Sequence, residues 1–159
     1  MKLTPGQTQL LKDLMIKSSQ KGNLANAGLV LENEKMIASE ESLVASNHDA
    51  TAHSERMLVA RVGELKNSNY TPGLIMVTVV EPCIMCMSAC SQAGYAEIVY
   101  IIPAAKYIEK LGWKMTDSVK IDKQKLAQDF SSQIKLTQIK ELEEEFSMVF
   151  EEAMKSELK

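Results

Sequence analysis

Apolar residues follow two different periods along this chain, and the change from one to the other predicts a sheet covered by helices. Two short runs are mostly apolar, residues 74–80 and 98–102, which is typical of strands buried on both faces. Around these runs, apolar residues recur every three or four positions, as they do on one face of a helix. This alternation indicates an α/β fold with a partly parallel sheet.

The first part of the chain predicts a helix followed by a hairpin. Thr4-Pro5-Gly6-Gln7 has the form of a capping box with proline at the first helical position, and its helix is expected to stop near Gly22. Residues 27–31 and 35–39 are expected to pair as a hairpin that turns at residues 32–34.

The remaining elements are expected to alternate between helix and strand. In order they are a helix through Leu65, a strand at 74–80, a helix from Pro82 to Gly94, a strand at 98–102 parallel to the earlier one, a helix starting at Pro103, a strand at 134–139 and a helix at 140–155.

Composition fits one ordinary globular domain. The chain has 159 residues, 45% hydrophobic and 25% charged, with a net charge of −3. We expect a single domain over residues 1–159, in which 107–159 form a C-terminal strand and helix extension. Apolar stretches fall short of the roughly 20 residues of a membrane span, and the first residues lack a signal-peptide pattern. These features predict a cytoplasmic protein with no membrane partner.

Two short motifs supply the side chains of a zinc site. Ala52-His53-Ser54-Glu55 offers one imidazole and one carboxylate, and Glu81-Pro82-Cys83-Ile84-Met85-Cys86 offers two thiols. Catalytic zinc sites take three protein ligands of this kind and keep a fourth position for water. His53, Cys83 and Cys86 are the expected ligands of Zn²⁺, and Glu55 is left over as a proton carrier. This H-x-E and P-C-x-x-C pair is the signature of zinc nucleobase deaminases.

The two motifs are expected to open two helices. Pro82 suits the first helical position, which places both cysteines in the first turn on one helix face. His53 and Glu55 converge only at the opening turn of a helix, for which Asp49 or Thr51 is the expected cap. The sequence therefore predicts that two helix N-termini meet at one metal ion.

The expected chemistry is hydrolytic deamination. Two thiolates balance the charge of Zn²⁺, and the metal lowers the pKa of its water toward roughly 7. Glu55 is expected to take the water proton, pass it to a ring nitrogen of the substrate and then protonate the departing ammonia, while hydroxide attacks the ring carbon that carries the amine.

Other interpretations of the same residues remain open. A C-x-x-C motif alone is equally typical of a redox pair or of half a structural zinc site, so a non-enzymatic module is the competing hypothesis. Cys90 is expected to be a small buried core residue. His48 is expected to lie in a surface loop.

The two motifs resemble the cytidine deaminase-like superfamily. The stretch Asn47-His48-Asp49-Ala50-Thr51-Ala52-His53-Ser54-Glu55 is most similar to the branch of guanine deaminases, tRNA adenosine deaminases and cytosine deaminases. The likeness runs from about residue 23 to residue 106. It implies a three-layer α/β/α fold with a central mixed sheet of about five strands, and a homodimer or larger assembly.

The resemblance also implies which residues contact the substrate. These are Ser42, Ala52, His53, Glu81 and Pro82. Members of this branch commonly carry an asparagine at the end of the second strand, and ungapped placement puts Ser42 there, so the substrate or its pose is expected to differ in this chain.

Charge and the motif around His53 favour a small substrate, with guanine or a similar purine base first. A tRNA deaminase attracts phosphates through a basic face, whereas this chain is acidic overall. Cytosine or a cytidine compound, and a tRNA adenosine, are the alternatives. A local basic patch would serve tRNA, although a solvated helix face also explains these lysines: Lys106, Lys110, Lys114, Lys120, Lys123 and Lys125.

Overall fold

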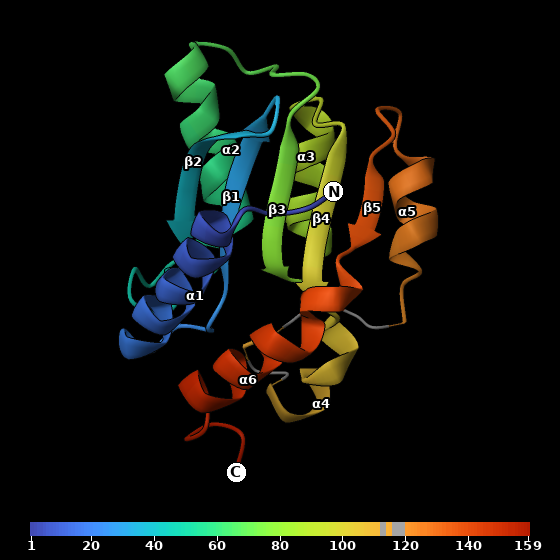
Figure 1. Ribbon diagram of the computed structural model, residues 1–159. Helices are drawn as coiled ribbons and strands as arrows, with labels where there is room; N and C mark the ends of the chain where they lie inside the picture. The colour runs from blue at the N-terminus through green and yellow to red at the C-terminus, as the bar shows by residue number, and fades with distance from the viewer. Residues whose placement is uncertain (112–113, 116–119) are drawn as a thin grey trace.

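The computed structural model describes residues 1–111, 114–115 and 120–159, and its centre is a five-stranded sheet (Figure 1). The strand order is β2-β1-β3-β4-β5. Their bounds are β1 (Ala27–Glu32), β2 (Lys35–Glu41), β3 (Ile75–Val80), β4 (Glu97–Ile102) and β5 (Lys135–Gln138). β1 pairs antiparallel with β2 and β3, whereas β3–β4 and β4–β5 are parallel. The expected mixed sheet of about five strands is confirmed.

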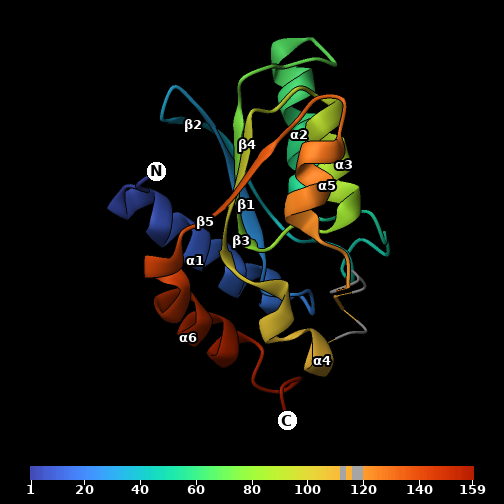
Figure 2. The same ribbon diagram turned by 90° about the vertical axis from the view of Figure 1, so that its right-hand side faces the viewer.

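Helices cover both faces of this sheet, which gives the expected three layers (Figure 2). α2, α3 and α5 lie on one face, α1 and α6 lie on the other, and α4 lies beyond the ends of the strands, packed in the same apolar cluster as α1 and α6. The helical bounds are α1 (Pro5–Gln20), α2 (Ser54–Lys66), α3 (Ile84–Gln92), α4 (Ile108–Leu111), α5 (Lys123–Asp129) and α6 (Glu143–Ala153), with short 3₁₀ helices η1 (Ala104–Lys106) and η2 (Lys140–Leu142).

The core is divided by the sheet into two apolar clusters, because successive strand residues point to opposite faces. On β3, Val77 and Val79 belong to the cluster under α1 and α6, while Met76 belongs to the cluster under α2 and α3. Residues of β3 from Met76 to Val80 are all buried. The prediction that this apolar run is a central strand is therefore confirmed.

Local sequence signals account for the N-terminal elements. Thr4 caps α1 and accepts from the backbone N–H of Gln7, whose side chain in turn accepts from the backbone N–H of Thr4. Asn33 and Glu34 both have positive φ, 49° and 67°, at the turn between β1 and β2. This pair of left-handed residues matches the twist of a two-residue hairpin. The capping box and the hairpin are both confirmed.

The region after β4 differs in detail from the expectation. Pro103 is the N-cap of the 3₁₀ turn η1, and α4 follows after Tyr107, so the helix expected to start at Pro103 is present as two short pieces. α5 was not expected as an element, although Asp122 caps it by accepting from the N–H of Lys125. The expected last strand and last helix are present as β5 and α6. Within the described ranges, every helix is too short or too polar to cross a membrane.

Candidate active site

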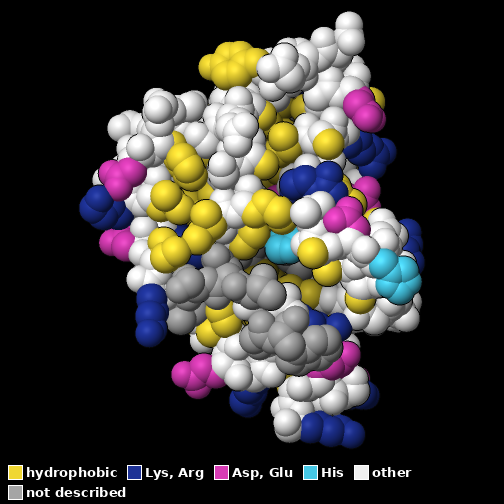
Figure 3. Space-filling model, turned by 180° about the vertical axis from the view of Figure 1, so that it is seen from behind, with side chains coloured by type: hydrophobic (Ala, Val, Ile, Leu, Met, Phe, Trp, Pro, Cys, Tyr) yellow, Lys and Arg dark blue, Asp and Glu magenta, His cyan; other side chains and the backbone are white. Residues whose placement is uncertain are grey.

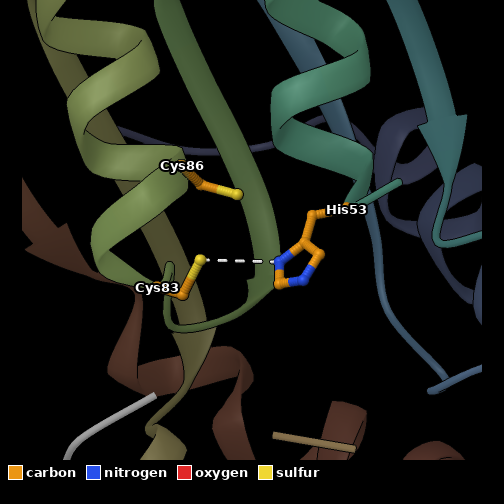
Figure 4. A group of neighbouring side chains, drawn as sticks. All are labelled: His53, Cys83 and Cys86. Carbon is orange, nitrogen blue, oxygen red and sulfur yellow. Dashed lines mark hydrogen bonds between the residues drawn. The ribbon is translucent and has the colours of Figure 1, made fainter. Parts of the chain in front are cut away.

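Two helix N-termini meet at one end of the sheet, beside the end of β3 (Figure 4). His53 is the N-cap of α2 and Cys83 is the N-cap of α3. Both residues have extended backbones and make no side-chain cap hydrogen bond, so the imidazole and the thiol are left to face each other. The expected meeting of two helix starts is confirmed.

Both helices begin later than the sequence suggested. The expected cap at Asp49 or Thr51 is wrong, because Asp49 instead accepts from the N–H and the hydroxyl of Thr51, both at 2.8 Å, in a turn before α2. Pro82 is not the first helical residue, since Cys83 is the N-cap and α3 starts at Ile84. The extended backbones at both caps aim the two side chains at the space between the helices.

The three candidate ligands form one compact group. The donor atoms of His53, Cys83 and Cys86 all lie within 4.8 Å of one another, and Nδ1 of His53 is 3.5 Å from Sγ of Cys83. Tetrahedral Zn²⁺, with bonds of about 2.3 Å to sulfur and 2.0–2.1 Å to nitrogen, holds its donor atoms about 3.5–3.8 Å apart. The pair of His53 and Cys83 has this spacing, and one nitrogen and two sulfurs within 4.8 Å of one another are close enough to share one zinc ion.

The electrostatics of the group favour an ionised sulfur. Hydrogen bonds from Cys86 and from His53 lower the pKa of Cys83 to about 4, although burial opposes them. The same contact with Cys83, together with burial, raises the pKa of Cys86. The hydrogen bond to Cys83 raises the pKa of His53. Since a thiolate rather than a thiol binds metal, Cys83 is ready to act as a ligand near neutral pH.

Glu55 lies directly beside this group, on the first turn of α2, and is only 2% exposed. Its Oε1 accepts the hydroxyl of Thr78 at 2.5 Å and the amide of Asn26 at 3.2 Å. Its Oε2 is 3.5 Å from Sγ of Cys86. One carboxylate oxygen is thus anchored to the sheet, and the other faces the three candidate ligands.

Two adjoining pockets open onto this centre. The inner one has a volume of about 50 Å³ and is lined by His53, Glu55 and Cys83 among others. The outer one has a volume of about 330 Å³. Four described residues line both pockets: Leu24, Asn26, His53 and Lys114. A ligand in the outer pocket therefore has direct access to the histidine and, through the inner pocket, to the carboxylate.

Of the expected substrate-binding residues other than His53, two line a pocket and two do not. Ser42 lines the outer pocket. Glu81 lines the inner one, where its Oε2 accepts the N–H of Ala104 at 2.8 Å and its Oε1 is 3.9 Å from Nζ of Lys123. Ala52 and Pro82 are buried, and neither is among the described residues that line the two pockets. Their contact with substrate stays a prediction.

Cys90 and His48, which were not expected to bind the metal, lie outside the group of candidate ligands. Cys90 is fully buried in the apolar cluster under α2 and α3, as expected. His48 is exposed and has a φ of 50° in the loop before α2, also as expected. The sequence analysis missed Asn26, whose amide reaches Glu55 from the start of β1. The only sign of Asn26 in the sequence is that a polar residue stands directly before a strand of buried residues.

The comparison with protein families agrees with this geometry. Residues 7–102 match the cytidine and deoxycytidylate deaminase zinc-binding region. The chain belongs to this family. The match includes both motifs, so zinc is the cofactor that the family shares and that the group of His53, Cys83 and Cys86 fits.

Individual relatives are distant. A tRNA-specific adenosine deaminase of Aquifex aeolicus is 23% identical over 84 residues, which covers 53% of this chain and 56% of the relative's length. A solved tRNA:A34 deaminase has a TM-score of 0.69 at 17% identity, covering 89% of this chain and 96% of its own. Guanine deaminase from Nitrosomonas europaea has a TM-score of 0.75 at 16% identity, covering 96% and 86%. At these identities the structural matches establish the fold.

Proposed function

We propose that this member of the family hydrolytically deaminates a nucleobase or nucleoside, and that a guanine-type purine base is the preferred substrate. The observation that carries the proposal is the position of Glu55, a buried carboxylate with one oxygen 3.5 Å from Sγ of Cys86. Neither a structural zinc site nor a redox pair requires a buried carboxylate beside its cysteines. A deaminase needs one to move protons.

In this proposal His53, Cys83 and Cys86 hold the zinc ion, and Glu55 carries the protons. Bound zinc supplies an acidified water whose pKa is lowered toward about 7. Glu55 accepts a proton from that water through Oε2 and gives it to a ring nitrogen of the substrate. The resulting hydroxide adds to the ring carbon that carries the amine. Glu55 then moves the remaining proton of that hydroxyl to the amine, which leaves as ammonia while the carbon becomes a carbonyl.

The pockets suit a flat ring. Leu24, Val44 and Ala50 supply apolar walls in the outer pocket, and Ser42 supplies a hydroxyl. Small-molecule sites typically combine apolar walls with a few polar groups that fix orientation. The roles of Ser42 and Glu81 in binding substrate are part of this proposal, and so are those of Ala52 and Pro82.

The lysines of the C-terminal region support a small substrate over tRNA. Lys106 lies 3.4 Å from Glu143, Lys125 lies 2.7 Å from Asp129, and Lys123 is 94% buried near Glu81. Cations paired with carboxylates contribute less to phosphate binding than an unpaired basic face does. A tRNA adenosine deaminase is the second candidate, favoured by the relative from Aquifex aeolicus.

The deciding experiment measures ammonia released from separate substrates by the purified, zinc-loaded chain. The panel contains guanine, adenosine, cytosine, cytidine and a tRNA anticodon stem-loop. Turnover of guanine above the others supports the proposal. Turnover of the stem-loop alone would replace it with the tRNA activity, and turnover of cytosine or cytidine alone would replace the purine preference. Silence on the whole panel would reject a nucleobase deaminase.

We further propose a cytoplasmic homodimer. Two thiols three residues apart bind metal only while they stay reduced, which the cytoplasm ensures. The dimer rests on the family resemblance and on the face formed by α2, α3 and α5, where hydrophobic side chains gather over the middle of the molecule with charged ones around them (Figure 3). Ile84 and Met85 of α3 are partly exposed. Light scattering that gives the monomer mass at micromolar concentration would reject the dimer.

A further inference from the structure

Asn26 connects three segments that build the candidate site, although neither motif includes it. It directly precedes β1 and is 7% exposed. Its backbone oxygen accepts the N–H of Ser42 at 2.9 Å, and its side-chain oxygen accepts the N–H of Val80 at 2.9 Å. Its amide nitrogen donates to Glu55 at 3.2 Å. One residue therefore ties the end of β2 and the end of β3 to the first turn of α2.

The orientation of the Asn26 amide follows from its partners. A backbone N–H only donates, so the group that faces Val80 must be the amide oxygen. The amide nitrogen is thereby turned toward Glu55, whose carboxylate accepts the hydrogen bond. Flipping the amide would bring two donors together at Val80 and two acceptors together at Glu55.

This contact determines which oxygen of Glu55 faces the metal centre. Oε1 receives two donors, the amide of Asn26 and the hydroxyl of Thr78. Oε2 lies on the side of Cys86, at 3.5 Å from its sulfur, and also accepts the hydroxyl of Ser54 at 3.3 Å. With Oε1 anchored at two points, rotation of the carboxylate away from Cys86 would break both hydrogen bonds.

We propose that Asn26 is a positioning residue that holds Glu55 with Oε2 toward the three candidate ligands. This inference rests on the proposed function, in which Oε2 moves the protons. Asn26 acts through Glu55 and does not itself touch the reacting atoms. The competing explanation is that Asn26 only fixes the end of β3 through Val80.

Two substitutions at the same position separate these explanations. Asn26→Asp keeps an oxygen for the N–H of Val80 but replaces the donor to Glu55 with a second carboxylate, whereas Asn26→Ala removes both contacts without adding a charge. If Asn26 positions Glu55, both variants lose kcat on guanine by about 10- to 100-fold, with KM within about twofold and zinc content unchanged. If Asn26 acts only through Val80, Asn26→Asp keeps the kcat of the unmodified chain, and that result would overturn the inference.

Matched controls exclude general effects of the substitution. Asn69→Asp makes the same change in the exposed loop before β3 and is expected to leave kcat unaltered. Thr78→Val removes the second donor to Oε1 and is expected to lower kcat, and Thr78→Ser is expected to restore it. Failure of Thr78→Ser to recover more activity than Thr78→Val would also count against anchoring of Oε1.

A structural measurement keeps this inference separate from the proposed function. Crystal structures of the zinc-loaded chain and of Asn26→Ala compare the Glu55 carboxylate directly. We expect its Oε2 beside Cys86 in the first and a rotated carboxylate in the second. An identical carboxylate in both would overturn the role of Asn26 even in an active enzyme. Absence of turnover on the whole substrate panel would reject the proposed function, while the two structures would still decide the role of Asn26.

Discussion

Oε2 of Glu55 lies 3.5 Å from Sγ of Cys86, although the two residues open different helices and are 31 positions apart in the chain. Burying a carboxylate is unfavourable unless hydrogen-bond donors compensate, and the thiol of Cys86 donates to Oε2. Here Thr78 donates to the opposite oxygen of Glu55. A cation at the centre of His53, Cys83 and Cys86 would stabilise the same arrangement, because it attracts both the carboxylate and the thiolates.

Replacing Glu55 by glutamine tests its role as proton carrier. Glu55→Gln keeps the shape of the side chain but removes its basic oxygen, so we expect deamination to fall by about 10²–10⁴-fold. Zinc content, measured by mass spectrometry, is expected to stay at one ion per chain. Glu64→Gln, the same change at an exposed position of α2, serves as the control and is expected to be fully active. Full activity of Glu55→Gln would contradict the mechanism.

The cysteines are expected to divide into metal-binding and structural ones. Cys83→Ser removes a candidate ligand, so the chain is expected to lose its zinc and to unfold at lower temperature, since bound metal stabilises the folded state. Cys90→Ala changes a buried residue outside the donor group and is expected to keep its zinc at a cost of about 1 kcal/mol. Zinc analysis and thermal unfolding of both variants check this. Equal zinc content in the two would reject Cys83 as a ligand.

The sequence predicted the donor group because its constraints are local. Proline before Cys83 and the spacing of the two cysteines place both sulfurs at one helix start, whichever residue is the formal cap. The caps themselves were mispredicted by propensity. Asp49 accepts a hydrogen bond from the N–H of Thr51 and caps no helix. The cap positions are occupied by His53 and Cys83, which are needed at the metal centre.

Long-range contacts were beyond prediction from the sequence. Asn26 reaches Glu55 because α2 packs against β1, and it reaches Val80 because β1 pairs with β3; neither contact can be predicted from one segment alone. α5 has only seven residues, too few for a clear helical period, and its packing on β5 decides that it forms.

Gly28 is expected to be required at the centre of the sheet. A Cβ atom there would lie 2.9 Å from the backbone oxygen of Val77 and 3.1 Å from Cδ1 of Leu58. Gly28→Ala therefore overpacks the contact of β1 with β3 and α2, and we expect a loss of about 1–3 kcal/mol in the free energy of unfolding.

The matched variant is Gly6→Ala in the first turn of α1, where the nearest atom to a new Cβ is Oγ1 of Thr4 at 3.9 Å. It is expected to be neutral or stabilising, because alanine favours helix more than glycine does. Denaturant unfolding of the two variants gives the comparison. A stability of Gly28→Ala equal to that of the unmodified chain would show that β1 relaxes without cost.

The pKa of Cys83 predicts how its alkylation depends on pH once zinc has been removed with a chelator. Its ordinary pKa of 9.0 is lowered to about 4, so the group is already a thiolate from pH 6 to pH 8. The rate of its reaction with iodoacetamide is therefore expected to be nearly constant over that range. An unshifted thiol would react about tenfold faster with each pH unit. Cys90, whose pKa burial raises, is expected to remain unlabelled.

Mass spectrometry of the labelled peptides follows each cysteine separately, and adding zinc back before iodoacetamide provides the control. Zinc is expected to protect Cys83, because a sulfur bound to metal is no longer free to react. A tenfold rise in the labelling rate per pH unit would mean that Cys86 and His53 do not stabilise the thiolate of Cys83. Labelling of Cys83 unchanged by zinc would place the metal elsewhere and remove the basis of the proposed chemistry.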